Sequence, residues 1–495
     1  MARSATPVNF TLDLTPAAGP RSGQVARAMI EAIAAGQVQD GDRLPSTRTV
    51  AVTFGLARAV VVGAYEELTA AGFLVTLPGG STRVEHGASA AARAGAFGAA
   101  LPAAAGPAVP ASGPPARDPA GTRPVRYDLR PGQADPQLIA GRDWSRAMRV
   151  AALPAREPGE LDSRPGGGTA PLSHADLREQ LASHLRRLRG LAVDPAGIFV
   201  FPSVTLALRA VAAVCGLGGA RVAFEDPGYA KARRALADAG VTIRPVPVDE
   251  DGISARDLRA ADRAVYVTPA HQFPLGGRMP ASRRAELLAR AAAQDILVLE
   301  DDYDGEFRYD VPPLTPLRAM PAAADRVIYF GTSSKILSRG LRVSWAVLPA
   351  RFRAAMTDYL DRSGDSVSRV STAFLAGYIA SGALTRHHSR AMRTYRARQA
   401  RFVAACREHI PGARALGIEA GLHVVLAFDG ELDDAAAAAR LAGRGLACVP
   451  LSAFYASPGP ARVPGLVCGY SRLPETSAAA AAALIGEVTR ELAQA

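Results

Sequence analysis

Lys335 lies in the stretch YFGTSSKILSRGLRVSW, residues 329–345, and is one of only two lysines in a chain of 495 residues. The other is Lys231, so all the remaining basic side chains among the 57 Lys and Arg residues are arginines. A lysine amine can lose its proton and form a Schiff base with a carbonyl group, whereas an arginine stays charged in proteins. Composition alone leaves two interpretations open: a chemically reactive amine, or a surface lysine without a function.

The residues around Lys335 favour the reactive amine. The apolar run RVIYFG before it predicts a strand, so the lysine lies near a carboxyl end, where open α/β sheets bind ligands. Three hydroxyl residues precede the lysine, and an arginine follows seven positions later: Thr332, Ser333, Ser334 and Arg342. An amine beside hydroxyls and a guanidinium suits a ligand that carries both an aldehyde and a phosphate group.

The elements that must position these groups are those of an α/β fold. Apolar runs alternate with longer helical patterns: GIFVFP, RVAFEDPGY, RAVYVTP, ILVLEDDYD and RVIYFGTSS. Continuous apolar runs separated by helices predict a mainly parallel sheet with helices on both faces. From about residue 371 the pattern is helical, and the last runs, LHVVLAF, LACVPLS and GLVCGYSRL, predict a small C-terminal α+β subdomain from about residue 375.

The N-terminal segment has a different layout. One helix is predicted to end near Ala34, a second to begin at Pro45–Thr47, and a third to run from about Ala57 to Ala70 after a turn at Gly55. The run FLVTLPGGSTRV then predicts a hairpin with Gly79-Gly80 at its tip. Helix, turn, helix and hairpin form a winged helix-turn-helix, which is a DNA-binding layout.

A linker is predicted between these two parts. Residues 88–126 are rich in Ala, Pro and Gly and hold almost no large apolar side chains, so they cannot bury enough surface to offset their ordering entropy. A helical Ala-rich segment before the first prolines is the alternative. We therefore expect a winged helix-turn-helix domain at 1–87, a linker at 88–126 and the α/β domain at 127–495.

Composition sets broad limits on function. The chain is 48% hydrophobic and 21% charged, as globular proteins are, and its apolar runs are shorter than the roughly 18 residues of a membrane span. The four cysteines lack C-x-x-C spacing, so we expect neither disulfides nor a zinc site, and a cytoplasmic protein. The net charge of +11 permits a polyanionic partner. However, the first 88 residues hold seven arginines and seven acidic residues, so DNA contacts there must depend on placement.

The N-terminal segment resembles the GntR family of bacterial transcription regulators. The family signature LPSxR is present as Leu44–Arg48, followed by AYEELTAAGFL. The resemblance implies that Arg48 and Arg58 contact DNA, that Ser46 and Thr47 lie near its backbone, and that the Gly79-Gly80 wing enters the minor groove. The recognition helix begins with Ala-Arg-Ala-Val, so only Arg58 can donate hydrogen bonds from that stretch. A winged helix used for protein contacts is the alternative.

The α/β part resembles fold-type I aminotransferases, which use pyridoxal 5′-phosphate (PLP). By that resemblance Lys335 forms the Schiff base with PLP, while Thr332, Ser334 and Arg342 hold its phosphate. The match rests on GTSSK and on EDDYDGEFRY, TPAHQFP and EDPGY upstream.

The upstream motifs imply further contacts with the PLP ring. Asp301 is implied to pair with the pyridine nitrogen, Tyr303 to lie near the phenolic oxygen, and Tyr229 to stack on the ring. The segment VTPAHQFPLGG is implied to line the site, with either His271 or Gln272 near the cofactor. Taken alone, EDDYDGE is also compatible with a hard metal cation. Together with the lysine and arginine downstream it favours PLP, and we expect no metal.

The phosphate-binding loop departs from the family pattern. Relatives carry a glycine-centred loop whose amides hold the phosphate at a helix N-terminus, whereas this chain has Val204 between Ser203 and Thr205. A valine amide can still donate, but valine resists a positive φ. We therefore expect the hydroxyls of Ser203 and Thr205 to compensate. The arginine for a substrate carboxylate stays open between Arg462 and Arg472.

As a whole, the chain resembles the MocR subfamily of GntR regulators, which join a winged helix to an aminotransferase-like domain. The resemblance implies a PLP-dependent regulator of transcription that binds a double-stranded operator and senses an amino compound, a vitamer or PLP. It also implies a head-to-tail homodimer in which each DNA-binding domain lies near the partner's large domain. Two alternatives stay open: an active aminotransferase with a vestigial winged helix, and a regulator whose PLP site has degenerated.

Overall fold

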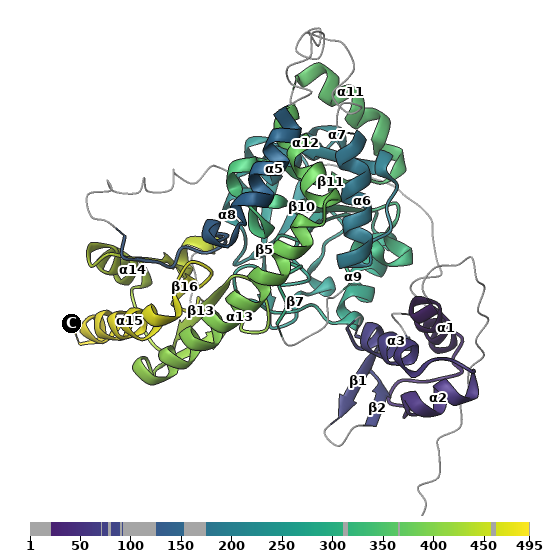
Figure 1. Ribbon diagram of the computed structural model, residues 1–495, viewed down its shortest axis with the longest axis horizontal. Coiled ribbons are helices and arrows are strands. Elements are labelled where there is room, and N and C mark those ends of the chain that lie inside the picture. Colours follow the sequence, from purple (N-terminus) through teal and green to yellow (C-terminus); the bar gives the residue numbers. More distant parts are fainter. Residues whose placement is uncertain are drawn as a thin grey trace, which may run out of the picture.

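The computed structural model describes residues 21–70, 72–77, 81–89, 92, 125–152, 175–309, 315–364, 367–456 and 462–494. Figure 1 shows a small N-terminal unit beside a large sheet with its helices, and a C-terminal part on the other side of that sheet. No helix in these ranges has both the length and the apolarity that a membrane crossing requires.

The N-terminal unit is a winged helix-turn-helix, as predicted. Its elements are α1 (Arg21–Ala34), α2 (Thr47–Thr53), α3 (Arg58–Ala70), β1 (Leu74–Leu77) and β2 (Ser81–Val84). Helix α2 begins where Ser46 accepts a hydrogen bond from the Thr49 amide at 3.1 Å, which satisfies one of the free donors of its first turn. The Tyr65 hydroxyl donates to the Pro45 carbonyl at 2.7 Å and so ties α3 to the start of α2. The predicted wing tip, Gly79-Gly80, lies outside the described residues.

The central sheet has eight strands in the order β4-β11-β10-β9-β8-β5-β6-β7. The strands β10, β9, β8, β5 and β6 are parallel, whereas β11 runs antiparallel to both β10 and β4, and β7 runs antiparallel to β6. The bounds are β4 (Ile198–Phe201), β5 (Arg221–Asp226), β6 (Thr242–Asp249), β7 (Gly252–Ile253), β8 (Asp262–Val267), β9 (Leu297–Asp301), β10 (Val327–Thr332) and β11 (Ser344–Val347).

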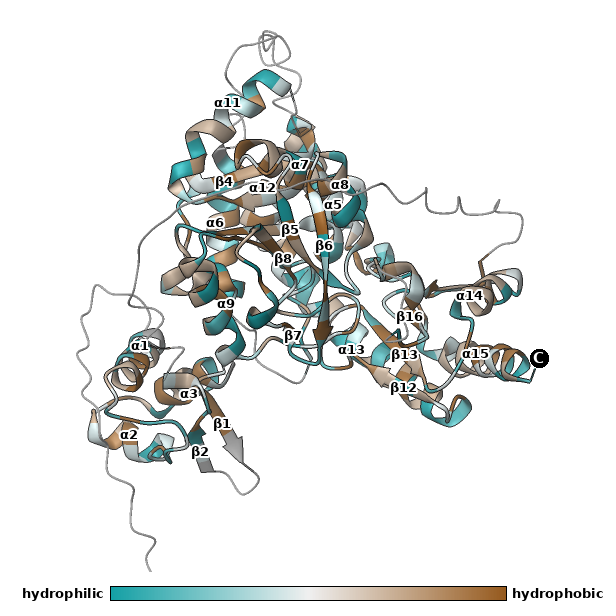
Figure 2. Cartoon of the chain, turned by 180° about the vertical axis from the view of Figure 1, so that it is seen from behind, coloured by the Kyte–Doolittle hydropathy of each residue, from teal (hydrophilic) through white to brown (hydrophobic). Residues whose placement is uncertain are grey.

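Both faces of this sheet are buried, which explains the continuous apolar runs in its strands. In β10, Ile328 and Phe330 pack with α7, α8 and α11, whereas Tyr329 packs on the opposite face with α6 and α12. Helix α9 covers the remaining part of that second face. Figure 2 shows the apolar colouring concentrated in the central sheet. The helices are α5 (Gly141–Ala152), α6 (Ala175–Arg189), α7 (Val204–Val214), α8 (Ala230–Asp238), α9 (Ala281–Ala293), α10 (Ser333–Ile336), α11 (Arg353–Ser363) and α12 (Arg369–Ala380).

The long helix α13 (Ala383–His409) leads to the C-terminal part, which has the predicted α+β composition. Its four-stranded antiparallel sheet has the order β12-β13-β16-β15, with α14 (Asp434–Gly443) and α15 (Ala478–Ala493) alongside. A separate parallel pair joins β3 (Tyr127–Asp128) to β14 (Leu446–Ala447), so the segment that enters the large domain is anchored on the C-terminal part. The other strands are β12 (Ala413–Leu416), β13 (His423–Phe428), β15 (Val449–Pro450) and β16 (Gly465–Gly469).

Candidate functional site

The predicted site residues follow strands that end at one edge of the central sheet. Because β5, β8, β9 and β10 are parallel, their carboxyl ends meet at this edge, and β4 ends there too because it is also antiparallel to β11. The segments that follow these strands carry Ser203, Tyr229, His271, Asp301, Tyr303 and Lys335. Residues far apart in the sequence are thus brought together by strand direction alone.

The Lys335 amine lies in an enclosed position at this edge. Its Nζ donates to the Gly132 carbonyl at 2.8 Å. Burial, assisted by the Arg339 guanidinium and opposed by the Asp304 carboxylate, lowers the pKa of Lys335 to about 8. Gly132 has φ +68°, a conformation that favours glycine, and a Cβ built on it would lie 2.2 Å from Nζ, so a larger residue would be strained and would displace the amine. Sequence reasoning missed Gly132, whose only signal was a Pro-Gly pair before a run without apolar periodicity.

Asp301 ends β9 with one oxygen satisfied and the other free. Its Oδ2 accepts from the Tyr266 hydroxyl at 2.5 Å, whereas Oδ1 is buried without a hydrogen-bond partner among the residues that the structure describes. Burial and the nearby Asp302 raise the pKa of Asp301 to about 7, although the Tyr266 hydrogen bond lowers it. A buried carboxylate oxygen without a donor costs free energy, so a ligand N–H at this position would be stabilised. Sequence reasoning also missed Tyr266.

A second cluster of polar side chains surrounds His271. Its Nδ1 lies 2.9 Å from the Tyr303 hydroxyl and 3.0 Å from the Asp304 Oδ2 atom, whereas its Nε2 is buried with no partner in the described part of the chain. The adjacent Gln272 donates from its amide to the Pro227 carbonyl at 2.9 Å and accepts from the Leu275 amide at 3.1 Å. His271 therefore has a free atom to offer, and Gln272 holds the loop in shape.

The other carboxylates of EDDYDGE are held by separate partners. The Asp302 carboxylate receives two hydrogen bonds from the buried Arg189 guanidinium, at 2.7 and 2.9 Å. The Glu300 carboxylate accepts from the amides of Leu317 and Arg318 at 2.6 and 2.8 Å. In the described ranges, no group of three or more His, Cys, Asp and Glu residues is arranged to hold a metal ion. The Asp302 and Glu300 carboxylates of this acidic run therefore each have their own hydrogen-bond donors.

The segment after β4 places hydroxyls at the start of a helix. Ser203 caps α7, because its Oγ accepts from the Leu206 amide at 3.2 Å, and it also lies 2.9 Å from the Thr205 Oγ1. Val204 is the first residue of α7, and the described non-glycine residues with positive φ are Asp295 and Arg342. The expected conflict between valine and a positive φ therefore does not arise. The N-terminus of α7 presents free amides, as anion sites do.

A second set of hydroxyls surrounds the start of α10. The Thr332 Oγ1 lies 3.0 Å from the Ser334 Oγ and accepts from the Ser344 hydroxyl at 2.9 Å. Arg342 has φ +53° and ψ +47°, and its side chain is exposed. The structure thus brings Thr332 and Ser334 together near Lys335, and it leaves the Arg342 guanidinium at the surface of this chain.

Tyr229 precedes α8 (Ala230–Asp238), and its ring lies edge-on to the Phe273 ring with centroids 5.7 Å apart. Burial and the nearby Asp301 raise the pKa of Tyr229 to about 12.

Neither candidate for a carboxylate-binding arginine is free. The Arg472 Nε donates to the Ala134 carbonyl at 2.9 Å, and the Arg462 guanidinium lies over the Tyr455 ring at 5.3 Å.

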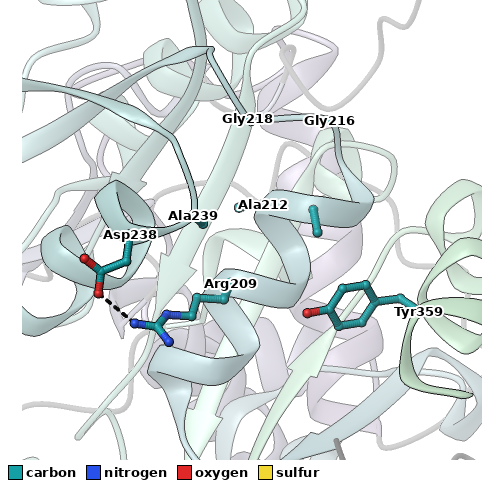
Figure 3. Close-up of a pocket in the computed structure, with 8 residues that line it drawn as sticks. Arg209, Ala212, Gly216, Gly218, Asp238, Ala239 and Tyr359 are labelled. Carbon is teal, nitrogen blue, oxygen red and sulfur yellow. Dashed lines mark hydrogen bonds and ion pairs between the residues drawn. The ribbon is translucent and has the colours of Figure 1, made fainter. Parts of the chain in front are cut away.

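A surface hollow of about 670 Å³ lies elsewhere, between the ends of α7 and α8 and the side of α11 (Figure 3). The ion pair between Arg209 and Asp238, at 2.7 Å, crosses it. The hollow is near the C-terminal end of α7, whereas Ser203 caps the N-terminal end of the same helix. No predicted site residue lines it.

Of the predicted DNA-binding residues that the structure describes, all but Thr47 are exposed. Arg48 and Arg58 are exposed at the starts of α2 and α3, and Thr47 is half-buried. Ser46 is exposed, but its hydroxyl is used in the α2 cap. On the same helix Val52 is 77% exposed, so this surface offers apolar contact beside its two guanidinium groups.

Comparisons with known proteins agree with both parts of the chain. Residues 143–464 match the family described as aminotransferase class I and II, and residues 21–84 match the bacterial regulatory proteins of the gntR family. The chain is 32% identical to the HTH-type pyridoxine biosynthesis transcriptional regulator PdxR of Corynebacterium glutamicum, over 90% of this chain and 91% of that protein. It is 30% identical to the probable rhizopine catabolism regulatory protein MocR of Rhizobium meliloti, over 92% and 91%.

Solved aminotransferase structures share the fold of the large domain. An archaeal alanine:glyoxylate aminotransferase matches with a TM-score of 0.66 at 25% identity, over 75% of this chain and 92% of that one. A kynurenine aminotransferase of Pyrococcus horikoshii, solved in complex with PMP, matches with a TM-score of 0.64 at 25% identity, over 75% and 92%.

Proposed function

This chain belongs to the MocR subfamily of GntR-family transcription regulators, and from that premise we propose that it binds an operator and uses PLP at Lys335 to sense an amino compound or a vitamer. The observation that carries the proposal is the pairing of two groups at one sheet edge. Lys335 is half-buried and its amine has a lowered pKa, and the Asp301 Oδ1 is buried without a donor among the described residues. Those are the two groups that an aldehyde cofactor with a ring nitrogen requires.

Bound PLP would supply a carbonyl for amines to attack and a protonated ring that withdraws electrons. Lys335 has a pKa of about 8, so about one-tenth of its amine is neutral and nucleophilic at pH 7. Asp301 keeps its carboxylate aimed into the site through Tyr266, and it would hold a proton on the ring nitrogen. Tyr303 and His271 would place a hydrogen-bonded pair beside the ring.

The phosphate would be held at two helix starts. The N-terminus of α7 offers backbone amides together with the hydroxyls of Ser203 and Thr205. Thr332 and Ser334 supply hydroxyls from the start of α10. Arg342 is exposed in this structure, and its guanidinium would add a charged contact to the phosphate.

The winged helix would bind double-stranded DNA through the start of α3. Arg58 would donate to base edges in the major groove and Arg48 would contact the backbone, while Ala57 and Ala59 offer only apolar contact. We further propose a cytoplasmic homodimer, since two winged helices read two half-sites. Two relatives are named for different processes, pyridoxine biosynthesis and rhizopine catabolism.

The absorption spectrum of the purified full-length protein with PLP tests the cofactor part of the proposal. Wild type should develop a visible band of lysine-linked PLP, and borohydride should fix the cofactor covalently on the peptide that contains Lys335. Lys335→Ala should show neither result. Lys231→Ala, which removes the other lysine, should behave as wild type. Equal spectra for wild type and Lys335→Ala would contradict the proposal and favour a regulator with a degenerate site.

An active aminotransferase is a second candidate, because the lysine, the aspartate and the fold all match that class. Incubation with a panel of amino donors and an oxo-acid acceptor separates the two functions. A regulator should show little or no turnover, whereas an enzyme should reach roughly 1 to 10³ turnovers per second.

A further inference from the structure

Three of the four cysteines lie together in the C-terminal part, which carries β16 in Figure 1. Cys468 of β16 is fully buried, Cys406 of α13 is 3% exposed, and Cys448, between β14 and β15, is half-buried. All three pack in or against the same apolar cluster. A side-chain hydrogen bond joins Cys468 to Cys448 and, together with burial, raises the pKa of the Cys468 thiol well above its usual value. Two thiols are therefore in contact, and a third is nearby.

The register of the C-terminal sheet explains why Cys448 and Cys468 meet. Strands β15 and β16 are antiparallel, with Val449 opposite Val467, and this register continued by one residue places Cys448 opposite Cys468. Side chains alternate between the two faces of a sheet, and the two valines indeed pack in a different apolar cluster from the two cysteines. The sequence gives no signal of this pair, because no motif marks a contact that depends on strand register.

Residues placed opposite each other in this way are near the geometry of a disulfide. Opposite residues in an antiparallel pair have Cβ atoms about 4.5–5.5 Å apart. A disulfide requires a Cβ separation of about 3.5–4.5 Å. A small approach of the two strands would therefore bring the Cys448 and Cys468 sulfurs within bonding distance.

The two cysteines flank the backbone that anchors the start of the large domain. The Leu129 amide donates to the Ala447 carbonyl at 2.8 Å, and the Gly469 amide donates to the Leu129 carbonyl at 2.7 Å. Ala447 directly precedes Cys448, and Gly469 directly follows Cys468. Leu129 is thus held from both sides by the neighbours of the two cysteines.

The anchored segment also holds the Lys335 amine. Three residues after Leu129, the Gly132 carbonyl accepts from Nζ at 2.8 Å. A Cβ built on Gly469 would lie 2.5 Å from the Arg130 carbonyl oxygen, so β16 packs tightly on the same segment. The hydrogen bond to Gly132 orients the amine. The freedom of residues 127–132 to move therefore affects how readily the amine can turn toward an incoming aldehyde.

We propose that Cys448 and Cys468 are an oxidisable thiol pair that closes to a disulfide, and that this disulfide restrains residues 127–132, which hold Lys335. The thiol pair stands on its own geometry, whereas its effect on the cofactor rests on the proposed function. A reversible bond of this kind suits a cytoplasmic protein, because disulfides in that compartment are usually transient and redox-sensing.

A peroxide is the oxidant, and the reaction has two steps. The Cys448 thiolate attacks the peroxide: an S–O bond forms, the O–O bond breaks, and the hydroxide that leaves takes up the thiol proton as water. The Cys468 sulfur then attacks the Cys448 sulfur: the S–S bond forms, the S–O bond breaks, and the hydroxyl leaves as water with the Cys468 proton. Both sulfurs are oxidised and the peroxide is reduced. A small dithiol reverses the reaction and is itself oxidised to a disulfide.

Peptide mapping of the full-length protein tests the thiol pair. Trypsin separates the two cysteines into peptides 445–462 and 463–472. After treatment with hydrogen peroxide these peptides should be joined, with a mass lower by two hydrogen atoms than their sum, and a dithiol should separate them. Cys448→Ser should give no joined product. Cys215→Ser, which changes the other half-buried cysteine, should give it as wild type does.

Two results of this mapping would overturn the thiol pair. One is a wild-type protein in which peptides 445–462 and 463–472 stay separate or are joined to the Cys406 peptide, 402–407, instead. The other is a joined product that runs with the mass of two chains under non-reducing conditions, because the register argument places both cysteines in one chain.

Hydrogen exchange tests the restraint on residues 127–132. In wild type, exchange of a peptide that covers this segment should slow about tenfold on oxidation, because the segment opens less often when both of its anchors are tied together. Cys448→Ser should exchange alike before and after peroxide treatment. Equal exchange in the reduced and oxidised wild type would overturn the restraint.

The rate at which PLP links to the protein tests the effect on the cofactor site. Oxidised wild type should form the visible PLP band about threefold more slowly than reduced wild type, since the restrained segment opens less often. Equal rates would overturn the effect on Lys335 and leave the disulfide intact. A protein that forms no band in either state would refute the proposed function, while peptide mapping would still decide the thiol pair.

Discussion

The sheet edge around Lys335 and the exposed surface of the winged helix around Arg58 use charge in opposite ways. At the sheet edge, burial moves the pKa of Lys335 down to about 8 and that of Asp301 up to about 7, so both groups titrate near neutral pH. On the winged helix, Arg48 and Arg58 are exposed to solvent. Schiff-base chemistry requires an amine that can lose its proton near neutral pH, whereas DNA binding requires cations that stay charged there. The two residue types are divided between the two regions accordingly.

The substitution with the largest expected effect on this contrast removes the buried Asp301 carboxylate. Asp301→Asn should weaken PLP binding on the order of 100-fold, because a charge-assisted hydrogen bond to the ring nitrogen contributes about 1.5–3 kcal/mol. DNA affinity without added PLP should not change. A PLP titration followed by absorbance measures the effect.

Asp238→Asn, in the hollow of Figure 3, is the matched control and should bind PLP as wild type does. Equal affinities for Asp301→Asn and Asp238→Asn would show that Asp301 does not contact the ring.

A substitution in the other region removes an exposed cation of the winged helix. Arg58→Ala should weaken binding to a selected operator by about 1–3 kcal/mol, or roughly 5- to 150-fold, and relax specificity at one base pair. Its PLP spectrum should match that of wild type.

Arg27→Ala on α1 makes the same change of charge outside the recognition helix, and it should lose far less DNA affinity when both variants are compared by fluorescence anisotropy. An unchanged affinity for Arg58→Ala would favour a winged helix used for protein contacts.

A pH series compares the titration of Lys335 with the constant charge of the arginines on the winged helix. Because burial lowers the Lys335 pKa to about 8, the neutral amine rises from about one-tenth at pH 7 to about half at pH 8. The rate at which PLP links to the protein should therefore rise roughly fivefold between these values and level off above pH 9. DNA binding by always-charged arginines should change little over the same range. A linking rate that is flat with pH would contradict the lowered pKa.

The smallest expected effect concerns Ser46, which the resemblance assigned to the DNA backbone and which the structure uses as a helix cap. Ser46→Ala should destabilise α2 by about 1 kcal/mol, so hydrogen exchange of residues 47–53 should quicken roughly fivefold. The exposed Val52→Ala is the control. A loss of DNA affinity without faster exchange would instead make Ser46 a DNA contact.

The sequence was most informative where a local pattern and a reactive residue type coincide. The helices and hairpin of the winged helix follow from caps, turn glycines and periodicity, and the parallel sheet follows from its continuous apolar runs. The residues that sequence reasoning missed, Gly132 and Tyr266, have no distinctive neighbours. Gly132 has a positive φ, and a Cβ there would displace the amine of Lys335, which lies 203 residues away in the chain. Such a constraint leaves no trace in the local pattern.

Residue types, their order and the family resemblance that they carry were enough to predict a regulator with a winged helix and a PLP-type domain, since Schiff-base chemistry needs a lysine and strand patterns are local. Three features were decided by the tertiary structure: the Asp301 oxygen that has no donor among the described residues, the position of Val204 at the start of α7 without a positive φ, and the close approach of Gly72 and Gly87 to the first turn of α9. Each depends on which atoms approach across the fold, and such distances are set by packing between segments that are remote in the chain.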